Sequence, residues 1–171
     1  MVWVIIIILV FGFVVFRGSP YVPSQKKYIN QAFTELHKIS KKDLLVDIGS
    51  GDGIVLRQAA RLGARAVGYE INPVLVLVAN LISFRNPRIT TKLADFWFAK
   101  LPDDTTVVYI FSVARDIKKL TIKIQAEVNR IGHPIHLISY AGEFDQFKMT
   151  KKLAAYRLYS VSPLQSDKAQ V

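Results

Sequence analysis

The segment LLVDIGSGDGIVL, residues 44–56, constrains the fold of this chain more than any other segment. A short apolar run ends near Asp47, and glycines then occupy every second position, at Gly49, Gly51 and Gly53, before apolar spacing resumes. An apolar run of this length, bounded by glycine, is typical of a strand buried on both faces. The glycines let the chain turn sharply into a helix, with no side chains between the backbone and a ligand. The segment therefore predicts a strand, a loop that binds a nucleotide-like ligand, and a helix.

Strand and helix patterns alternate along the rest of the chain. Helices are expected over about 53–62, from Asn72 and Pro73 onward, and over about 116–131, whereas the expected strands are RAVGYE, ITTKLAD, TTVVYIF, PIHLISY and LAAYRLYSV. This alternation predicts an α/β fold: a Rossmann-like sheet with helices on both faces and ligands at the carboxyl ends of the strands. Because only one strand pattern follows PIHLISY, we expect a sheet shortened at the C-terminus, with fewer than seven strands.

The first residues form the most apolar part of the chain. The run MVWVIIIILVFGFVVF contains no charged side chain and is followed by Arg17. It predicts a hydrophobic helix that anchors the protein in a membrane by a single pass, although spanning helices usually have ~20 apolar residues. A cleaved signal peptide and a buried apolar element remain alternatives, but no basic region precedes the run. Arg17, Lys26 and Lys27 flank it on the C-terminal side only, which favours a globular part in the cytoplasm or the equivalent mitochondrial matrix.

These patterns divide the chain into four segments. The prolines of PYVPS block helix formation, and apolar residues from Tyr28 to Ile39 then repeat at helical spacing. The residues after Ser162 are mostly polar. We therefore expect a membrane anchor over 1–17, a linker and leading helix over 18–40, one α/β domain over 41–162 and a flexible tail over 163–171.

The charge of the chain favours anionic partners. Its net charge of +10 suits lipid head groups, nucleic acid or acidic protein, and the predicted anchor favours an anionic lipid surface. Nucleic acid is less favoured because no long basic block with interleaved aromatic residues occurs, and a merely solvated basic surface remains an alternative. The chain has no cysteine, which excludes disulfides and a thiolate nucleophile. The histidines, His37, His133 and His136, lack the spacing of a metal site, so no metal is expected.

Two features distinguish the glycine loop from a dinucleotide-binding loop. The dinucleotide fingerprint has its third glycine three positions after the second, where this chain has Ile54, whereas Gly53 comes two positions after Gly51. A carboxylate at Asp47 is unfavourable beside a pyrophosphate and favourable beside a cationic ligand. Glu70 ends the next predicted strand, where an acid can accept hydrogen bonds from both hydroxyls of a ribose.

The pattern Asp47-x-Gly49-x-Gly51-x-Gly53, followed by Glu70, resembles the first motifs of the class I S-adenosylmethionine-dependent methyltransferases. The resemblance implies S-adenosylmethionine as the cofactor. It also implies that Asp95 faces the adenine amino group and that Phe96 forms a wall for the ring, although a polar loop residue and a core aromatic residue are alternative interpretations. The cofactor-binding residues implied in this way are Asp47, Gly49, Ser50, Gly51, Asp52, Gly53, Glu70, Ile71, Asp95 and Phe96.

A narrower resemblance is carried by PYVPS, DIGSGDGIVL, GYEINPVLV, ADFW and VVYIF, in this order, over roughly residues 20–111. Together they resemble the small membrane-associated protein-lysine methyltransferases, which include the mitochondrial enzymes for the adenine nucleotide translocase and the ATP synthase c subunit. The resemblance implies a lysine N-methyltransferase whose partner is a membrane protein with a target lysine. The chain has FSVARD where that family tends to carry glycine, valine and proline, which leaves the substrate open. An RNA methyltransferase and a non-catalytic, membrane-tethered nucleotide-binding module remain alternatives.

Methyl transfer to lysine requires a neutral amine. With a pKa near 10.4, about 0.1% of lysine is neutral at about pH 7.4, which corresponds to roughly 4 kcal/mol. An apolar channel lowers this cost by disfavouring the ammonium ion. Tyr21, Phe96 and Trp97 are candidates for the channel wall, with plain packing as the alternative. No residue is identified as the catalytic base: Asp95 and Asp116 follow strands at the reactive edge, and water can also accept the proton.

Overall fold

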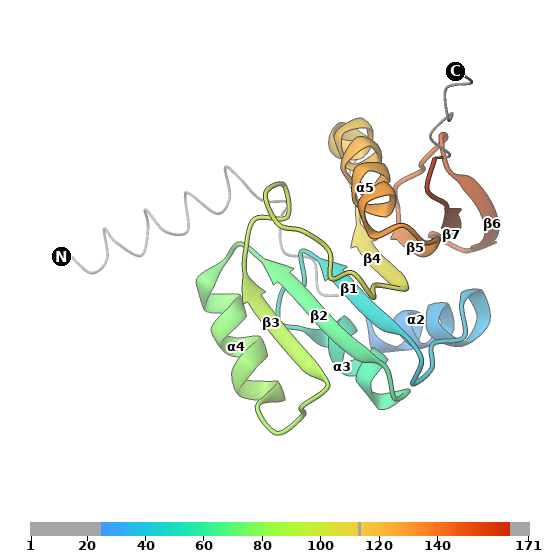
Figure 1. The fold of residues 1–171 in the computed structure, drawn as a ribbon. Helices are drawn as coiled ribbons and strands as arrows, with labels where there is room; N and C mark the ends of the chain where they lie inside the picture. The colour runs from blue at the N-terminus through green and yellow to red at the C-terminus, as the bar shows by residue number, and fades with distance from the viewer. Residues whose placement is uncertain (1–24, 113, 165–171) are drawn as a thin grey trace, which may run out of the picture.

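The computed structural model describes residues 25–112 and 114–164, and every structural statement below refers to these residues. The helical elements are α2 (Lys26–Gln31), the π-helical turn η1 (Ala32–Leu36), α3 (Ile54–Arg61), α4 (Pro73–Ser83), the 3₁₀ turn η2 (Ala114–Asp116) and α5 (Ile117–Ile131). The strands are β1 (Leu44–Ile48), β2 (Arg65–Glu70), β3 (Ile89–Leu93), β4 (Val107–Phe111), β5 (Ile135–Tyr140), β6 (Lys148–Leu153) and β7 (Tyr156–Val161). Figure 1 shows their arrangement around one twisted sheet.

The strands form a seven-stranded sheet in the order β3-β2-β1-β4-β5-β7-β6. The strands β1 to β5 run parallel, whereas β7 is antiparallel to both of its neighbours. The carboxyl ends of β1, β2, β3, β4 and β5 therefore meet at the same edge of the sheet. The expected Rossmann-like architecture is confirmed, but the expectation of fewer than seven strands is wrong.

The missed strand is β6, at the end of the sheet opposite β3 (Figure 1). Its sequence KMTKKL has no alternation of apolar and polar residues, and every residue before Leu153 is exposed. It is a strand because it pairs with β7, which no local pattern reveals. The predicted strand LAAYRLYSV corresponds to β7 and the last residue of β6, with a turn between them in which Ala154 has a φ of 51°.

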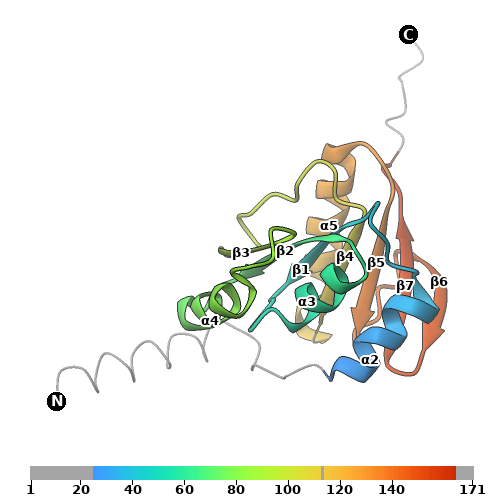
Figure 2. The ribbon, with the colours of Figure 1, turned by 90° about the horizontal axis from the view of Figure 1, so that it is seen from below.

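Helices cover both faces of the sheet, as expected. Figure 2 shows α2, α3 and α4 on one side and α5 on the other. Phe33 and Leu56 pack with Tyr109 in the core on the first side. Ile124 and Val128 of α5 belong to the core on the second side. The central strands β1, β4 and β5 are thereby largely buried on both faces, which explains their apolar sequences, whereas the edge strand β3 is mostly exposed.

The ends of the helices follow the sequence signals. The side chain of Asn72 accepts a hydrogen bond from the amide of Val74 at 3.0 Å, and Pro73 occupies the first turn of α4, as predicted. Gly132 ends α5 with a left-handed φ of 80°. The leading helix is shorter than expected: α2 passes into η1, which ends at Leu36, so that Ile39 lies beyond the helix.

The connection between β5 and β6 contains no helix. Because Lys148 and His136 both pair with Ser160, residues 141–147 run back from the carboxyl edge of the sheet to its amino edge. Phe144 and Phe147 of this strap are buried in the core, with ring centroids 5.7 Å apart. Two aromatic side chains therefore replace the apolar face that a crossover helix would supply.

Several predictions fall on residues 1–24 and 165–171, outside the described residues. These are the membrane anchor over 1–17, most of the linker, the channel candidate Tyr21 and most of the tail over 163–171. Among the helices that the structure describes, none combines the length and apolar character needed to cross a bilayer.

Candidate active site

The three predicted glycines shape the loop between β1 and α3. Gly49, Gly51 and Gly53 all have left-handed φ angles, of 79°, 54° and 78°. L-residues with a side chain rarely adopt such angles, which explains why glycine recurs at every second position. A Cβ atom added at Gly49 would meet no heavy atom within 4 Å, so open space faces the loop at that point. The loop therefore presents bare backbone to any ligand at the carboxyl edge of the sheet.

Glu70 joins the loop to the end of β2. Its Oε2 accepts a hydrogen bond from the amide of Gly51 at 2.9 Å, and its Oε1 accepts one from the amide of Asn72 at 2.8 Å. The side chain is buried, with 8% of the residue exposed. Each carboxylate oxygen can accept a further hydrogen bond, so the pairing to the backbone leaves room for ligand hydroxyls. The sequence predicted a ligand-binding acid here but not its role in holding the loop.

Asp47 brings a second acid to the same edge. Burial raises the pKa of its carboxyl well above the usual range, and the nearby carboxylates of Glu70 and Asp52 raise it further. No described residue donates a hydrogen bond to this carboxyl. A cationic group of a ligand would offset the repulsion between these acids. The site therefore suits a ligand that carries positive charge.

Replacing Asp47 by asparagine is expected to stabilise the ligand-free protein at neutral and alkaline pH. Because the folded-state pKa is raised, the folded protein binds a proton more tightly than the unfolded chain, so stability is gained as the pH falls through that pKa and lost as it rises. The variant lacks this loss, and each kcal/mol corresponds to about 2–4 °C in Tm for a domain of this size. Thermal unfolding of both proteins across the pH range measures the difference. A Tm difference that does not shrink toward acid pH would contradict the assignment.

Ser50 and Asp52 are the two predicted ligand residues that lie between the glycines of the loop. The Oδ1 of Asp52 accepts a hydrogen bond from the amide of Ile54 at 3.1 Å, and its Oδ2 pairs with Arg57 at 3.1 Å. Ser50 is buried against β2, where a Cβ atom at Gly68 would come within 2.4 Å of its Oγ. The backbone of both residues belongs to the bare loop. The side chain of Asp52 shapes its turn, whereas the buried hydroxyl of Ser50 has no hydrogen-bond partner among the described residues.

The segment after β3 holds the other predicted ligand residues. The Oδ1 of Asp95 accepts a hydrogen bond from the amide of Trp97 at 2.9 Å, which closes a tight turn. Phe96 is buried, and its ring centroid lies 6.4 Å from that of Tyr69. Trp97 is half-buried, with the Nζ of Lys119 3.8 Å from its ring centroid. Asp95 therefore lies near the carboxyl edge, whereas Phe96 packs mainly in the core.

Comparison with known proteins identifies the fold. No protein-family model matches the chain. The crystal structure of an RNA methyltransferase from Salinibacter ruber in complex with S-adenosyl-L-homocysteine aligns with a TM-score of 0.73 and 25% sequence identity, covering 86% of this chain and 97% of that chain. The chain has the class I methyltransferase fold. Its glycine loop and Glu70 thus occupy the carboxyl edge at which open α/β sheets bind their ligands.

Several curated relatives of this chain are named as protein-lysine N-methyltransferases. The ATP synthase c-subunit lysine N-methyltransferase of Xenopus laevis is 34% identical over 112 residues, which cover 64% of this chain and 48% of that protein. The adenine nucleotide translocase lysine N-methyltransferase of Mus musculus is 32% identical over 113 residues, with the same coverage of both chains. The chain thus spans about half the length of the curated relatives it matches. The resemblance to this group, inferred from the motifs, is confirmed.

Sequence reasoning missed polar and aromatic groups at the ends of β4 and β5. The hydroxyl of Ser112 lies 3.0 Å from that of Ser139, which donates to the carbonyl of Gly142 at 2.9 Å. The rings of Phe111 and Tyr140, on the other face of the sheet, stack with centroids 5.5 Å apart. Their position at the carboxyl ends of two buried strands is the sequence feature that could have identified them. In a methyltransferase fold they line the same edge as the glycine loop.

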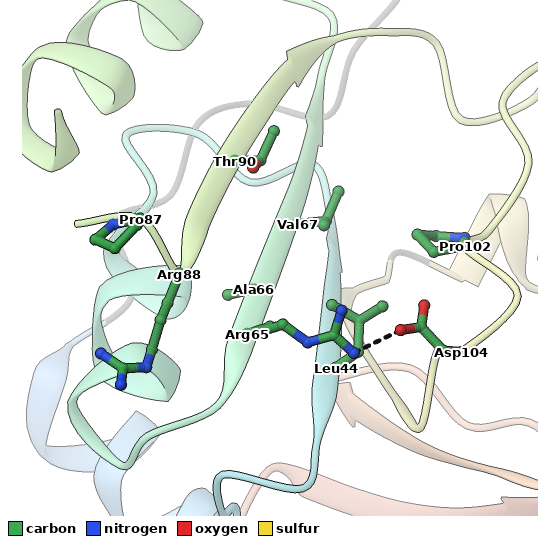
Figure 3. Close-up of a pocket in the computed structure, with 9 residues that line it drawn as sticks. All are labelled: Leu44, Arg65, Ala66, Val67, Pro87, Arg88, Thr90, Pro102 and Asp104. Carbon is green, nitrogen blue, oxygen red and sulfur yellow. Dashed lines mark hydrogen bonds and ion pairs between the residues drawn. The ribbon is translucent and has the colours of Figure 1, made fainter. Parts of the chain in front are cut away.

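A separate hollow of about 200 Å³ lies at the opposite edge (Figure 3). It is lined by residues at the amino ends of β1, β2 and β3, including Leu44 and Thr90. Across it, Arg65 pairs with Asp104 at 2.5 Å, and both side chains are more than half exposed. Because ligands of open α/β sheets bind at the carboxyl ends, this hollow is not the methyltransferase site.

Asp116, the second carboxylate considered as a catalytic base, pairs with the neighbouring residue in the chain. Its carboxylate lies 3.4 Å from the Nε of Arg115, directly before α5. No catalytic base is therefore assigned to it or to Asp95, which is bonded within its own turn. The described residues contain no group of three or more histidine, aspartate or glutamate side chains that could hold a metal, and the expectation of a metal-free site remains a prediction.

Proposed function

We propose that this chain is an S-adenosylmethionine-dependent protein-lysine N-methyltransferase that acts on a membrane protein. The observation that carries the proposal is the bare glycine loop bonded to Glu70, in a chain that is 34% identical to a lysine N-methyltransferase over 112 residues.

The residues of the site fit the chemical groups of S-adenosylmethionine. The remaining lone pairs of Glu70 would accept hydrogen bonds from the ribose hydroxyls, and the bare loop would contact the methionine part. The positive charge of the ligand would lower the raised pKa of Asp47 and favour its ionised form, so that charge and countercharge meet in the bound state. Asp95 would face the adenine amino group, with Ile71 and Phe96 as apolar neighbours. When bound, the cofactor supplies an electrophilic methyl group on a sulfonium.

The acceptor side must receive a neutral amine. The stacked rings of Phe111 and Tyr140 offer an apolar wall that disfavours an ammonium ion. The hydroxyls of Ser112 and Ser139 are buried and bonded to each other on the other face of the sheet, where they hold the ends of β4 and β5 together. Orientation matters because an in-line displacement requires the nitrogen behind the methyl group. The proton leaves to water or to a carboxylate that the structure does not single out.

The membrane assignment is part of the proposal. It is supported by the predicted anchor over 1–17 and by the relatives' substrates, the ATP synthase c subunit and the adenine nucleotide translocase. The linker from Arg17 to Pro23 reaches about 25 Å when fully extended, at ~3.6 Å per residue. Tethering of this kind would raise the effective concentration of lysines near the bilayer surface on the cytoplasmic or matrix side.

An RNA methyltransferase is the second candidate function. The observation that favours it is the alignment with the Salinibacter ruber RNA methyltransferase, which covers 97% of that chain, together with the net charge of +10. Against it stands the FSVARD sequence after β4, which lacks the Asn/Asp-Pro-Pro-aromatic motif common in enzymes that methylate base amino groups.

A labelling experiment separates these functions. The full chain is incubated with tritiated S-adenosylmethionine and with membranes, soluble proteins or total RNA, and S-adenosylhomocysteine serves as the inhibited control. We expect protein label in the membrane fraction to exceed that in the soluble fraction by at least about tenfold, because tethering concentrates the enzyme there. Mass spectrometry should place the label on a lysine near a membrane surface. Label confined to soluble proteins or to RNA would overturn the proposal.

A further inference from the structure

Helix α4 leaves most of its apolar side chains uncovered. Of its residues, Val76, Ala79 and Ser83 are buried against the rest of the domain. Leu77, Leu81 and Phe84 are 59%, 63% and 75% exposed. The large apolar side chains exposed between residues 74 and 98 are Val74, Leu77, Leu81, Ile82, Phe84, Leu93 and Phe98, which are seven of the twelve exposed in the described part of the chain. Concentration of this kind marks an interaction surface rather than scattered exposure.

The spacing of these side chains makes a continuous ridge on α4. Val74, Leu77, Leu81 and Phe84 follow one another at intervals of three or four residues, so they lie along one face of the helix. The opposite face carries Ala79 and packs on β2 and β3 next to the glycine loop, where a Cβ atom at Gly53 would lie 3.3 Å from the Cβ of Ala79. The ridge therefore points away from the domain.

The polar residues around the ridge carry charge of a single sign. Between Asn72 and Ala94 the charged residues are Arg85, Arg88 and Lys92, with no aspartate or glutamate. All three cations are exposed, and the guanidinium carbon of Arg85 lies 5.2 Å from the ring centroid of Phe84. The Nζ of Lys92 lies 5.9 Å from the ring centroid of Tyr69, on the face of the sheet that α5 covers, so Arg85 and Arg88 are the cations that border the ridge. An apolar face bordered only by cations matches the interface of an anionic bilayer, where apolar side chains enter the acyl boundary and cations meet phosphate.

The ridge begins at the edge that carries the candidate active site. Leu93 pairs in register with Glu70, and α4 starts three residues after Glu70. Figure 1 places α4 and β3 together at the end of the sheet opposite β6. A flat partner in contact with this end would thus lie next to the carboxyl edge.

We propose that the α4 surface, meaning the exposed face of α4 with Leu93, Arg85 and Arg88, docks on the surface of an anionic lipid bilayer. The single sign of its charge argues for anionic lipid over a second copy, because two copies would bring like charges together. The apolar run of residues 1–16 in the same chain is a second feature suited to lipid. The inference does not require methyl transfer, since it concerns contact with lipid alone.

The absence of cysteine makes the contact measurable with one probe. Leu81→Cys on α4 and Ile122→Cys on α5 each create a unique site for an environment-sensitive NBD fluorophore, and the two positions are similarly exposed, at 63% and 70%. Because α5 lies on the other face of the sheet, Ile122 is the matched control (Figure 2). The full chain is mixed with vesicles of phosphatidylcholine, with or without phosphatidylglycerol, and iodide quenching is measured.

We expect quenching at position 81 to fall by about fivefold with phosphatidylglycerol vesicles, because the probe enters the acyl boundary. Quenching at position 122 should stay unchanged, and Arg85→Glu with Arg88→Glu should restore quenching at position 81. Equal protection at both positions, or none at position 81, would overturn the proposal. Protection at position 81 without vesicles would also overturn it. In that case, dependence on protein concentration would indicate a second copy, and independence would indicate cover by another segment of the chain.

Discussion

Replacing Gly51 by valine is expected to abolish S-adenosylmethionine binding. Gly51 has a φ of 54°, and a β-branched side chain at a positive φ is a genuine outlier, so the loop must change its path. That change would withdraw the Gly51 amide from Glu70, which it now meets at 2.9 Å. The new side chain would also stand where the backbone has to approach the ligand. Calorimetry should show a loss of at least about 100-fold in affinity, equivalent to roughly 2.7 kcal/mol.

A matched glycine distinguishes loss of the site from loss of the fold. Gly132 also has a left-handed φ, of 80°, but it ends α5 at the amino edge of β5, away from the loop. Gly132→Val therefore imposes comparable backbone strain without touching the site. It should lower the Tm and leave cofactor affinity unchanged. If Gly51→Val retains binding, or if both variants lose it equally, the glycine loop is not the binding element.

Replacing Glu70 by alanine should weaken S-adenosylmethionine binding by about one to two decades, or roughly 1.5–3 kcal/mol, because two ribose hydroxyls lose their acceptor. It should also destabilise the protein. The amides of Gly51 and Asn72 would both lose their acceptor, and an unpaired buried amide costs about 1–3 kcal/mol. Calorimetry measures the affinity, and denaturant unfolding of the ligand-free protein measures the stability.

Glu127 provides the control for this second effect. It is also buried, and its Oε2 accepts a hydrogen bond from the amide of Leu101 at 2.9 Å. It belongs to α5, so Glu127→Ala should reduce stability without changing cofactor affinity. Unchanged affinity in Glu70→Ala would exclude Glu70 as the ribose acceptor. Unchanged stability in that variant would exclude its role in holding the loop.

The elements that could be predicted from the sequence are those that depend on local backbone conformation. The glycine loop, the Asn72 cap and the Gly132 end of α5 were all predictable, because left-handed angles and orphan amides demand particular residues. The central strands β1, β4 and β5 were equally clear, since burial on both faces produces apolar runs. The leading helix was predicted in place but not in length.

The parts that could not be predicted depend on contacts between distant residues. The hydrogen bond from Gly51 to Glu70 joins residues nineteen positions apart. From the sequence, Glu70 was predicted only as an acid that binds the ligand. The pairing of Asp52 with Arg57 and the burial of Phe96 depend on the packing around them. The stacked Phe111 and Tyr140 come from neighbouring strands, and no spacing in the sequence brings them together.

The strand β6 has a consequence for how the protein behaves at high concentration. It is the last strand of the sheet, so one side of its backbone has no partner strand within the described residues. Such an open edge invites another chain to add a strand and start aggregation. Here Lys148, Lys151 and Lys152 place repeated positive charge along that edge, and the register shifts between Met149 and Lys151. The lysines that remove the strand pattern from the β6 sequence thus also oppose the addition of a strand from a neighbouring molecule.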